Sequence, residues 1–349
     1  MSRKKVYKSP MQKAIALQKK KEMLNREWAS IRSLFGNTWA FFYVLLGARE
    51  AGKSYAVMKY FIYQWKTKNK PFTWLRLTEA SQRKLLCNDA EKFVDADIRR
   101  AFDLDLKVKG IQVYDHGKPM AKILALSTFY NDKGVALFDN EYDLGYNICL
   151  DEMNREKCEK NNFDITYAFV NQMENLVRST KEKLRIVLIG NTLEEASDIM
   201  CCFNFIPEKF GRYKVRKKKC VIDYIPPSDK YLKRRTGSVA DILAGDQSTF
   251  TNKIDVDKTL IYKGRLHKPT YVIKFTDTEY YTVWDGKVVT KWQHERVNII
   301  AMRPYMDVVF DTERRDLVYN LFHTRCYYFR DLITQKKMKK ALSLLKPTK

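Results

Sequence analysis

The sequence predicts an α/β fold with a mainly parallel sheet, followed by a smaller C-terminal α+β domain. From residue 41 to residue 190, short apolar runs alternate with helical stretches, which is the pattern of strand–helix–strand units. Beyond residue 205, prolines and basic runs interrupt this alternation, and strands with a hairpin signal follow. A chain of 349 residues is expected to form more than one domain. We predict a basic extension over 1–38, an α/β domain over 39–205, a basic linker subdomain over 206–244 and a smaller domain over 245–349.

The predicted α/β region contains strands that are buried on both faces. Such strands form short continuous apolar runs, because helices cover both faces of a parallel sheet. Runs of this kind occupy residues 41–46, 72–77, 148–150 and 185–190, and helical stretches cover 53–66, 79–102 and 166–180. The extension 1–38 repeats apolar residues at roughly helical spacing, so part of it is predicted to form an amphipathic helix.

The predicted C-terminal domain contains a hairpin. Its clearest signal is Asp285-Gly286, which lies between runs of alternating β-formers and suits a tight turn. Strands are predicted over 271–275, 281–284, 287–289 and 306–310, and helices over 313–323 and 331–345. This order of strands and helices predicts an α+β domain.

The net charge of +24 is concentrated in three segments. Residues 1–40 and 207–240 each carry a net charge of +8, and residues 325–349 carry +7. Segregated basic charge favours a polyanion partner, and DNA or RNA is preferred to a membrane because no apolar anchor accompanies these segments. Solvated faces and mobile tails are the alternative. Seven cysteines without C-x-x-C spacing and four scattered histidines argue against a zinc site or a disulfide framework.

The strongest motif is a phosphate-binding loop. Residues 47–54 match G-x-x-x-x-G-K-[ST] between a predicted strand and a predicted helix, and we call them the P-loop. In such a loop the backbone amides surround a nucleoside triphosphate, Lys53 reaches the β- and γ-phosphates, and the Ser54 hydroxyl ligates Mg²⁺. The predicted nucleotide-binding residues are Gly47, Ala48, Arg49, Glu50, Ala51, Gly52, Lys53 and Ser54.

Polar residues at two strand ends complete a predicted hydrolytic site. Asp151 and Glu152 end an apolar strand, where Asp151 would bind Mg²⁺ and Glu152 would align the attacking water. Asn191 follows the strand 185–190 and is placed to sense the γ-phosphate. The alternatives are a solvated acidic pair that opens the next helix, and a helix N-cap at Asn191.

Arg178 lies at the end of the predicted helix 166–180 and off its apolar face. An arginine in this place could reach the γ-phosphate bound by a neighbouring subunit. The alternative is simple complementation of the helix dipole.

Two competing motifs indicate other activities. Residues 252–255, Asn-Lys-Ile-Asp, match the guanine motif of GTPases, but they lie far beyond the P-loop and no D-x-x-G partner occurs. A two-metal nuclease would need several converging carboxylates, and the sequence does not show that they converge. The available carboxylates are Asp246, Asp255, Asp257, Asp307 and Asp311.

From about residue 40 to its end, the sequence resembles the DNA-packaging ATPases of the small phi29-like tailed phages. The likeness is carried by the P-loop with Tyr55-Ala56 after it, by Asp151-Glu152, by Leu176-Val177-Arg178 and by Gly190-Asn191. The resemblance implies that Tyr55 belongs to the nucleotide site and that Arg178 acts across a subunit boundary. Lys133 matches a family lysine that also acts across this boundary.

The resemblance also implies an assembly and its ligands. It implies an ASCE-type ATPase that uses ATP and Mg²⁺, in a ring of commonly five subunits docked on the portal of an empty capsid in the host cytoplasm. It further implies a short linker domain and a C-terminal domain that resembles RNase H but lacks nuclease activity. Double-stranded DNA is the expected partner, a packaging RNA is a candidate partner, and no membrane is involved. Glu50 departs from the small residue usual in this loop, and the extension 1–38 is longer and more basic than typical.

The leading hypothesis from the sequence is a ring ATPase that translocates double-stranded DNA into a preformed capsid. The rival of a different class is an ATP-switched nucleic-acid or scaffold binder without motor activity. A packaging motor with an active nuclease is the third hypothesis.

Overall fold

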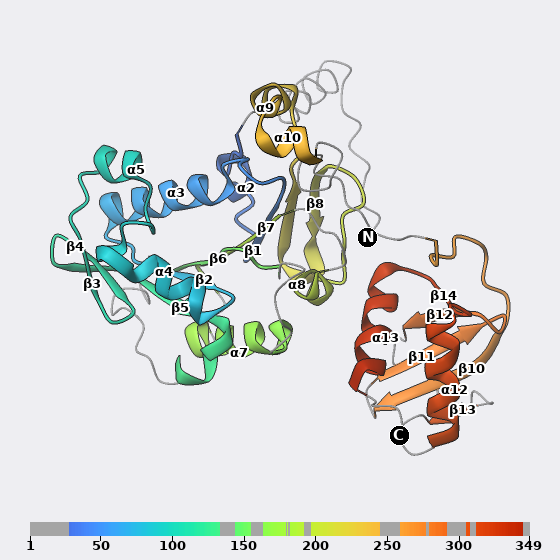
Figure 1. Ribbon diagram of the computed structural model, residues 1–349. Helices are drawn as coiled ribbons and strands as arrows, with labels where there is room; N and C mark the ends of the chain where they lie inside the picture. Colours follow the sequence, from blue (N-terminus) through green and yellow to red (C-terminus); the bar gives the residue numbers. More distant parts are fainter. Residues whose placement is uncertain are drawn as a thin grey trace, which may run out of the picture. The chain divides into compact units, whose positions relative to one another are not determined.

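The computed structural model describes residues 28–132, 144–154, 163–178, 180, 182–191, 197–244, 259–276, 279–291, 305–307 and 312–344. The chain divides into two compact units. The first comprises Met1–Phe203 and Pro207–Asp255, and the second comprises Asn204–Ile206 and Val256–Lys349. Figure 1 shows the elements of each unit.

The first unit is built on a nine-stranded sheet in the order β3-β4-β5-β2-β6-β7-β1-β9-β8. The central strands from β5 to β9 are parallel to their neighbours, and β3, β4 and β8 pair in antiparallel fashion at the edges. β7 therefore separates β1, which leads into the P-loop, from β6, which leads into Asp151. The strands are β1 (Phe42–Leu46), β2 (Phe72–Arg76), β3 (Leu106–Lys109), β4 (Gln112–Asp115), β5 (Lys118–Ala125), β6 (Tyr146–Leu150), β7 (Leu184–Gly190), β8 (Gly211–Val215) and β9 (Cys220–Tyr224).

The predicted α/β class with a mainly parallel sheet is confirmed. All residues of β6 are buried, and β1 is buried from Tyr43 to Leu46. Helices cover both faces of the sheet, with α3 (Lys53–Lys68) and α7 (Ile165–Val177) on opposite sides (Figure 1). Double coverage explains why these strands are continuously apolar in the sequence.

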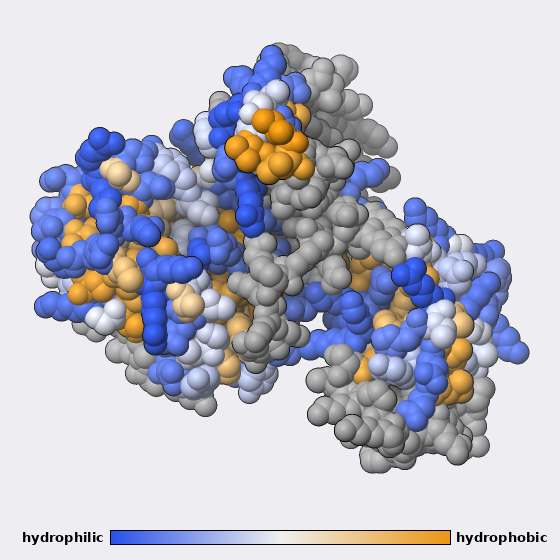
Figure 2. All heavy atoms as spheres, viewed as in Figure 1, coloured by the Kyte–Doolittle hydropathy of each residue, from blue (hydrophilic) through white to orange (hydrophobic). Residues whose placement is uncertain are grey.

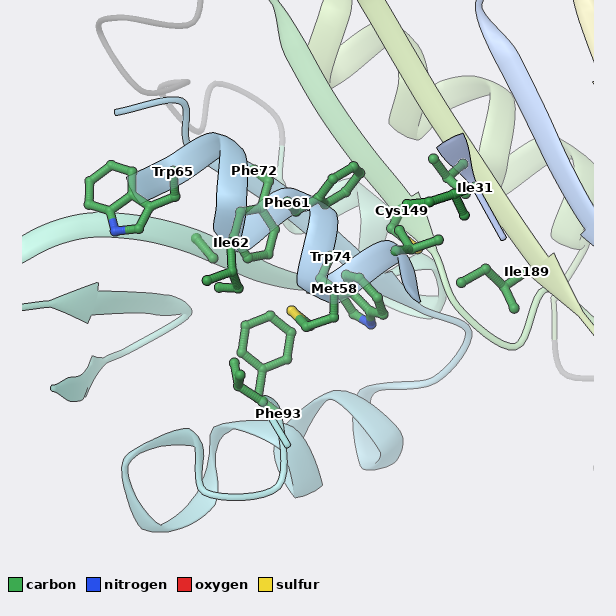
Figure 3. Packing of buried hydrophobic residues seen from close by; sticks show 14 of the residues in the cluster. Ile31, Met58, Phe61, Ile62, Trp65, Phe72, Trp74, Phe93, Cys149 and Ile189 are labelled. Carbon is green, nitrogen blue, oxygen red and sulfur yellow. The ribbon is translucent and has the colours of Figure 1, made fainter. Parts of the chain in front are cut away.

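α3 packs on one face of the sheet through large apolar side chains. Its residues Met58, Phe61, Ile62 and Trp65 are buried and belong to the cluster that Figure 3 shows. The ring centroids of Phe61 and Phe72 lie 5.4 Å apart, which is a favourable distance for an aromatic pair. Because α3 begins directly at Lys53, this packing fixes the direction of the helix that carries the end of the P-loop.

The remaining helices of this region differ in part from the prediction. The predicted helix 79–102 is two helices, because Asn88, Asp89 and Ala90 have φ angles of 51°, 51° and 60° that interrupt it. Of the extension 1–38, residues 28–38 are described, and they contain one short helix. No helix in the described part of the chain has the length and apolar character needed to cross a bilayer. The helices are α2 (Arg32–Phe35), α4 (Glu79–Ala90), α5 (Ala96–Ala101), η1 (Leu126–Asp132) and α8 (Asp198–Cys202).

The structure differs from the predicted linker subdomain 206–244. β8 and β9 complete the nine-stranded sheet, with β9 beside β1, and every residue of β9 is buried. The turn between them contains η2 (Arg216–Lys218), and α9 (Asp229–Arg235) and α10 (Val239–Ala244) follow. Three apolar side chains of α10 are exposed and form the patch visible over this helix in Figure 2: Val239, Ile242 and Leu243.

The second unit contains a five-stranded mixed sheet in the order β13-β10-β11-β12-β14. Asp285 and Gly286 have φ angles of 50° and 73° between β11 and β12, so the predicted hairpin is confirmed. The elements are β10 (Pro269–Thr276), β11 (Glu279–Trp284), β12 (Val288–Lys291), β13 (Tyr305–Asp307), α12 (Thr312–His323), β14 (Tyr328–Phe329) and α13 (Leu332–Leu344). The GTPase-like motif 252–255 and the carboxylates Asp246, Asp255, Asp257 and Asp311 lie outside the described residues.

Candidate active site

The P-loop joins the buried end of β1 to the start of α3, and its geometry requires both glycines. Gly52, the residue before α3, has a φ of 72°, and a Cβ there would lie 3.0 Å from Cε3 of Trp28. A Cβ on Gly47 would lie 3.2 Å from Cβ of Ile225. Left-handed backbone and close approach of this kind both favour glycine. The loop therefore turns tightly into the N-terminus of a 16-residue helix, where anions bind favourably.

Lys53 is buried against the P-loop backbone. Its Nζ donates hydrogen bonds to the carbonyl oxygens of Gly47 at 2.8 Å and Ala48 at 2.6 Å, and to Oδ1 of Asn191 at 3.4 Å. Burial lowers the pKa of Lys53 to about 8; the charge of Asp151 opposes this effect and that of Arg49 adds to it. The structure therefore brings together Lys53 and Asn191, as the sequence predicted from two different strand ends.

Backbone hydrogen bonds fix the turn that carries the acidic pair. The Asp151 amide donates to the Leu75 carbonyl at the end of β2, at 3.0 Å, and the Met153 amide donates to the Ile189 carbonyl of β7, at 2.9 Å. Between these two anchors Glu152 has a φ of 57° and a side chain that is 58% exposed. Asp151 is buried, so the two adjacent carboxylates have different environments.

Asp151 and Ser54 form the oxygen pair expected of a magnesium site. The Ser54 hydroxyl donates a hydrogen bond to Oδ1 of Asp151 at 2.8 Å. Mg²⁺ in phosphoryl-transfer sites takes protein oxygens of this kind together with phosphate oxygens and waters. The two side chains present therefore fit the predicted metal.

Arg76 is a residue of this site that the sequence analysis missed. It is the last residue of β2, and its guanidinium bridges the acidic pair. Nη1 lies 2.9 Å from Oδ2 of Asp151, and Nη2 pairs with Oε2 of Glu152. In the sequence, Arg76 is only a basic residue at the end of a predicted strand. Its role in the site becomes clear only from the pairing of β2 with β6.

These residues surround a single cavity of about 360 Å³ at the carboxyl ends of β1, β6 and β7. Gly47 and Ala48 contribute to the site through their carbonyl oxygens, which accept hydrogen bonds from Lys53. The predicted residues that line the cavity are Arg49, Glu50, Ala51, Gly52, Lys53, Ser54, Tyr55, Asp151, Glu152 and Asn191. Tyr55 also donates a hydrogen bond to Asp97 of α5 at 2.6 Å.

The structure does not bring Arg178 to this cavity. Because α7 connects two parallel neighbours, β6 and β7, it runs from the carboxyl end of the sheet back to the amino end. Arg178 follows α7, so it lies toward the amino end, and it is exposed. Its φ of 46° and ψ of −129° are uncommon for a residue with a side chain. Lys133 lies outside the described residues, and Asp132 before it accepts a 3.0 Å hydrogen bond from Gln172 of α7.

Comparison with protein families gives a match over most of the chain. The model of the podovirus DNA encapsidation protein, Gp16, matches residues 33–345. This chain belongs to the podovirus DNA encapsidation family. The chain is 24% identical over 283 residues to the DNA packaging protein of Bacillus phage phi29, covering 79% of this chain and 77% of that one. It is 25% identical over 239 residues to the DNA packaging protein of Bacillus phage B103, covering 65% and 68%.

Solved structures share the fold of this chain over nearly its whole length. The Phi-28 gp11 DNA packaging motor gives a TM-score of 0.65 at 15% identity, covering 93% of this chain and 99% of that one. The bacteriophage Phi-29 viral genome packaging motor assembly gives a TM-score of 0.61 at 18% identity, covering 92% and 100%. Membership of this family makes viral DNA packaging the function of this chain.

Proposed function

We propose that this chain is the ATP-hydrolysing subunit of a ring motor that moves double-stranded DNA into a preformed capsid. One observation carries the proposal. A single edge of a parallel sheet brings together a buried lysine, a hydroxyl–carboxylate pair and a second, exposed carboxylate. The position of β7 between β1 and β6 supports the ASCE-type arrangement that the resemblance implied.

Each side chain at this edge has a chemical role in the proposal. Lys53 binds the β- and γ-phosphates of ATP. Ser54 and Asp151 hold Mg²⁺, which neutralises charge on the transferred phosphoryl group. Glu152 accepts a proton from the attacking water, because it lines the cavity and, unlike Asp151, is not bonded to Ser54. Asn191 reaches the γ-phosphate from the end of β7.

Arg76 positions both carboxylates in this scheme. Its guanidinium contacts one oxygen of Asp151 and one of Glu152, and it comes from the strand next to theirs. A planar group with fixed donor directions restricts the orientation of each carboxylate. Orientation of this kind contributes to rate because the water and the phosphate must meet in one geometry.

The lowered pKa of Lys53 predicts that ATP binds less tightly at high pH. The charged ammonium attracts phosphates, and in the free protein it loses its proton as the pH rises through about 8. At pH 9 only about a tenth of the free protein carries the proton, so the Kd of ATP should rise about tenfold between pH 7 and pH 9. Ionisation of the terminal phosphate does not offset this rise of the Kd, because phosphate esters are fully ionised above about pH 7.

A titration with a fluorescent ATP analogue measures this dependence. Circular dichroism over the same pH range controls for loss of fold. A Kd that stays constant from pH 7 to pH 9 would contradict the role of Lys53 as a titrating phosphate ligand.

We propose that Arg178 and Lys133 act on the nucleotide of a neighbouring subunit. Arg178 is exposed and lies toward the end of the sheet opposite its own P-loop, so it is placed for a partner's site better than for its own. In a head-to-tail ring each subunit offers one surface to the site of the next, which a single chain cannot complete. The ring of five, the portal and a packaging RNA are parts of the same proposal.

The exposed tip of the β8–β9 hairpin is the proposed contact for the DNA backbone. Arg216, Lys217, Lys218 and Lys219 are all exposed there, at the amino end of β9. Arg216 lies 4.8 Å from the ring centroid of Trp39, and the Lys219 carbonyl accepts hydrogen bonds from Phe41 and Phe42. The tip is therefore held in place, and its charges suit phosphates without base recognition.

DNA-stimulated ATP hydrolysis tests the motor proposal. Linear double-stranded DNA should raise the hydrolysis rate of the wild-type chain. The double variant Lys217→Glu, Lys218→Glu should bind that DNA at least tenfold more weakly, with a salt slope smaller by about 2, because two phosphate contacts are lost. Fluorescence anisotropy at several salt concentrations measures both quantities.

A control variant with the same change of charge, and the alternative function without motor activity, give this test its other outcomes. The double variant Lys84→Glu, Lys92→Glu changes the net charge by the same amount at exposed positions around α4, and it should retain the wild-type affinity for DNA. Equal losses in both double variants would argue against the hairpin tip. Slow hydrolysis by the wild type, whatever the length of the DNA, would instead favour an ATP-switched binder without motor activity.

We also propose an RNase H-like second unit without nuclease activity. The antiparallel strands β10, β11 and β12, with β13 parallel to β10, support a mixed α+β sheet of that general kind. Of the candidate carboxylates, Asp307 ends β13, and the other four lie outside the described residues. A plasmid that stays intact with the chain and Mn²⁺ would support this proposal, and nicking would favour a motor with an active nuclease.

A further inference from the structure

Glu50 is the unusual residue of the P-loop, since it places a negative charge beside a phosphate site. Its side chain is 60% exposed and lines the nucleotide cavity. A carboxylate near a bound triphosphate repels it unless a cation compensates. The loop therefore needs a compensating group close to Glu50.

Helix α9 supplies that compensation from a distant part of the sequence. Nη1 of Arg235 lies 2.6 Å from Oε1 of Glu50, and Nη1 of Arg234 lies 3.6 Å from Oε2. The side chain of Arg235 is 9% exposed, so this pair is well shielded on the arginine side. Two basic residues of the charged segment 207–240 thus contact the P-loop instead of a nucleic acid.

The same helix also holds the backbone of the P-loop. Arg234 donates a hydrogen bond from Nη2 to the Glu50 carbonyl at 2.8 Å, and the Tyr231 hydroxyl donates to the Arg49 carbonyl at 3.0 Å. These two carbonyls lie on either side of the Cα atom of Glu50, whose φ is 60°. A left-handed residue with a side chain persists when its surroundings fix it.

Trp28 completes this contact on the other side of Arg234. The guanidinium of Arg234 lies 4.2 Å from a ring centroid of Trp28, within the range of a cation–π contact. The Ala29 amide donates to the Ala51 carbonyl at 2.8 Å, so the chain next to Trp28 is bonded to the P-loop as well. Residues 49–52 are therefore held between α9 and the segment 28–29.

We propose that Glu50 and Arg235 form a positioning pair for ATP, in which α9 neutralises the P-loop carboxylate and holds the loop in its phosphate-binding conformation. The inference rests on the proposed function and deepens it, because it assigns control of the nucleotide site to α9. It follows that the charge of Glu50 weakens ATP binding only when Arg235 is absent.

A double-mutant cycle tests the pair. Arg235→Gln should raise the Kd of a fluorescent ATP analogue about tenfold, because it removes the closer of the two cations that compensate the Glu50 charge beside the phosphates. In the Glu50→Gln background, the same Arg235→Gln change should alter the Kd less than about twofold. For hydrolysis, KM should rise with the Kd while kcat at saturating ATP changes less than about twofold, since the pair does not touch the reacting atoms.

Arg212→Gln is the matched control for general loss of stability. It breaks another arginine–carboxylate pair of the same unit, Arg212 with Asp223 at 2.8 Å, which is also shielded from solvent. This variant should shift the melting temperature and keep the wild-type Kd. Either an unchanged Kd in Arg235→Gln or an equal rise of the Kd in both Glu50 backgrounds would overturn the pair. Failure of the proposed function has a different signature, namely absence of ATP binding or hydrolysis in the wild-type chain.

Discussion

Glu152→Gln is expected to lower ATP hydrolysis by about 10²–10⁴-fold while ATP remains bound. The amide keeps the size of the side chain and its contact with Arg76, but it cannot take a proton from water. The contacts assigned to binding come from Lys53, Ser54 and Asp151, which the substitution leaves in place. Single-turnover hydrolysis and the Kd of a fluorescent ATP analogue, measured on the same preparation, separate the two effects.

Glu79→Gln is the control for this substitution. Glu79 begins α4 a few residues after Arg76, and it pairs with Arg83 on the surface. Its removal should leave hydrolysis near the wild-type rate. If Glu152→Gln also turned over near that rate, the catalytic carboxylate would have to be a different group.

Arg178→Ala should lower hydrolysis by about 10³–10⁵-fold when every subunit carries it, which is the usual contribution of an arginine supplied from a neighbour. When Arg178→Ala subunits are mixed with Lys53→Ala subunits, which lack the phosphate-binding lysine, part of the activity should return, because an intact P-loop then meets an intact Arg178 of its neighbour. Steady-state hydrolysis at a series of mixing ratios, with DNA present, measures this return of activity.

Arg100→Ala distinguishes this role from complementation of a helix dipole. Arg100 is an exposed arginine in the last turn of α5, so it lies at a helix C-terminus, as Arg178 does, but on a different helix. Its substitution should leave hydrolysis unchanged. Mixtures of Arg178→Ala and Lys53→Ala subunits that stay inactive at every ratio would speak against action across a subunit boundary.

The sequence predicted the parts of the site that local patterns determine. The P-loop follows from its spacing, and Asp151-Glu152 and Asn191 follow from their places after buried strands. Parallel strands bring their carboxyl ends to one edge, so these three signals converge in the fold without further information.

The contacts that the sequence could not predict depend on tertiary neighbours. Arg76 acquires a role because β2 lies beside β6, and Glu50 is explained by Arg235 far along the chain. The prolines and basic residues of segment 206–244 predict a linker, whereas the segment contains β8 and β9 of the nine-stranded sheet. β9 is buried beside β1 although a basic turn precedes it, and no pattern in that turn shows which sheet it joins.

The place of β7 between β1 and β6 has a mechanical consequence. Hydrogen-bonded neighbours in a sheet are spaced about 4.8 Å apart, so the ends of β1 and β6 are held about 10 Å apart by a strand that is bonded on both sides. β7 therefore acts as a stiff spacer, since neither neighbour can slide along it without breaking a whole ladder. The separation of the two halves of the site is therefore set by the sheet, and the loops at the strand ends are the parts of the site that these ladders do not fix.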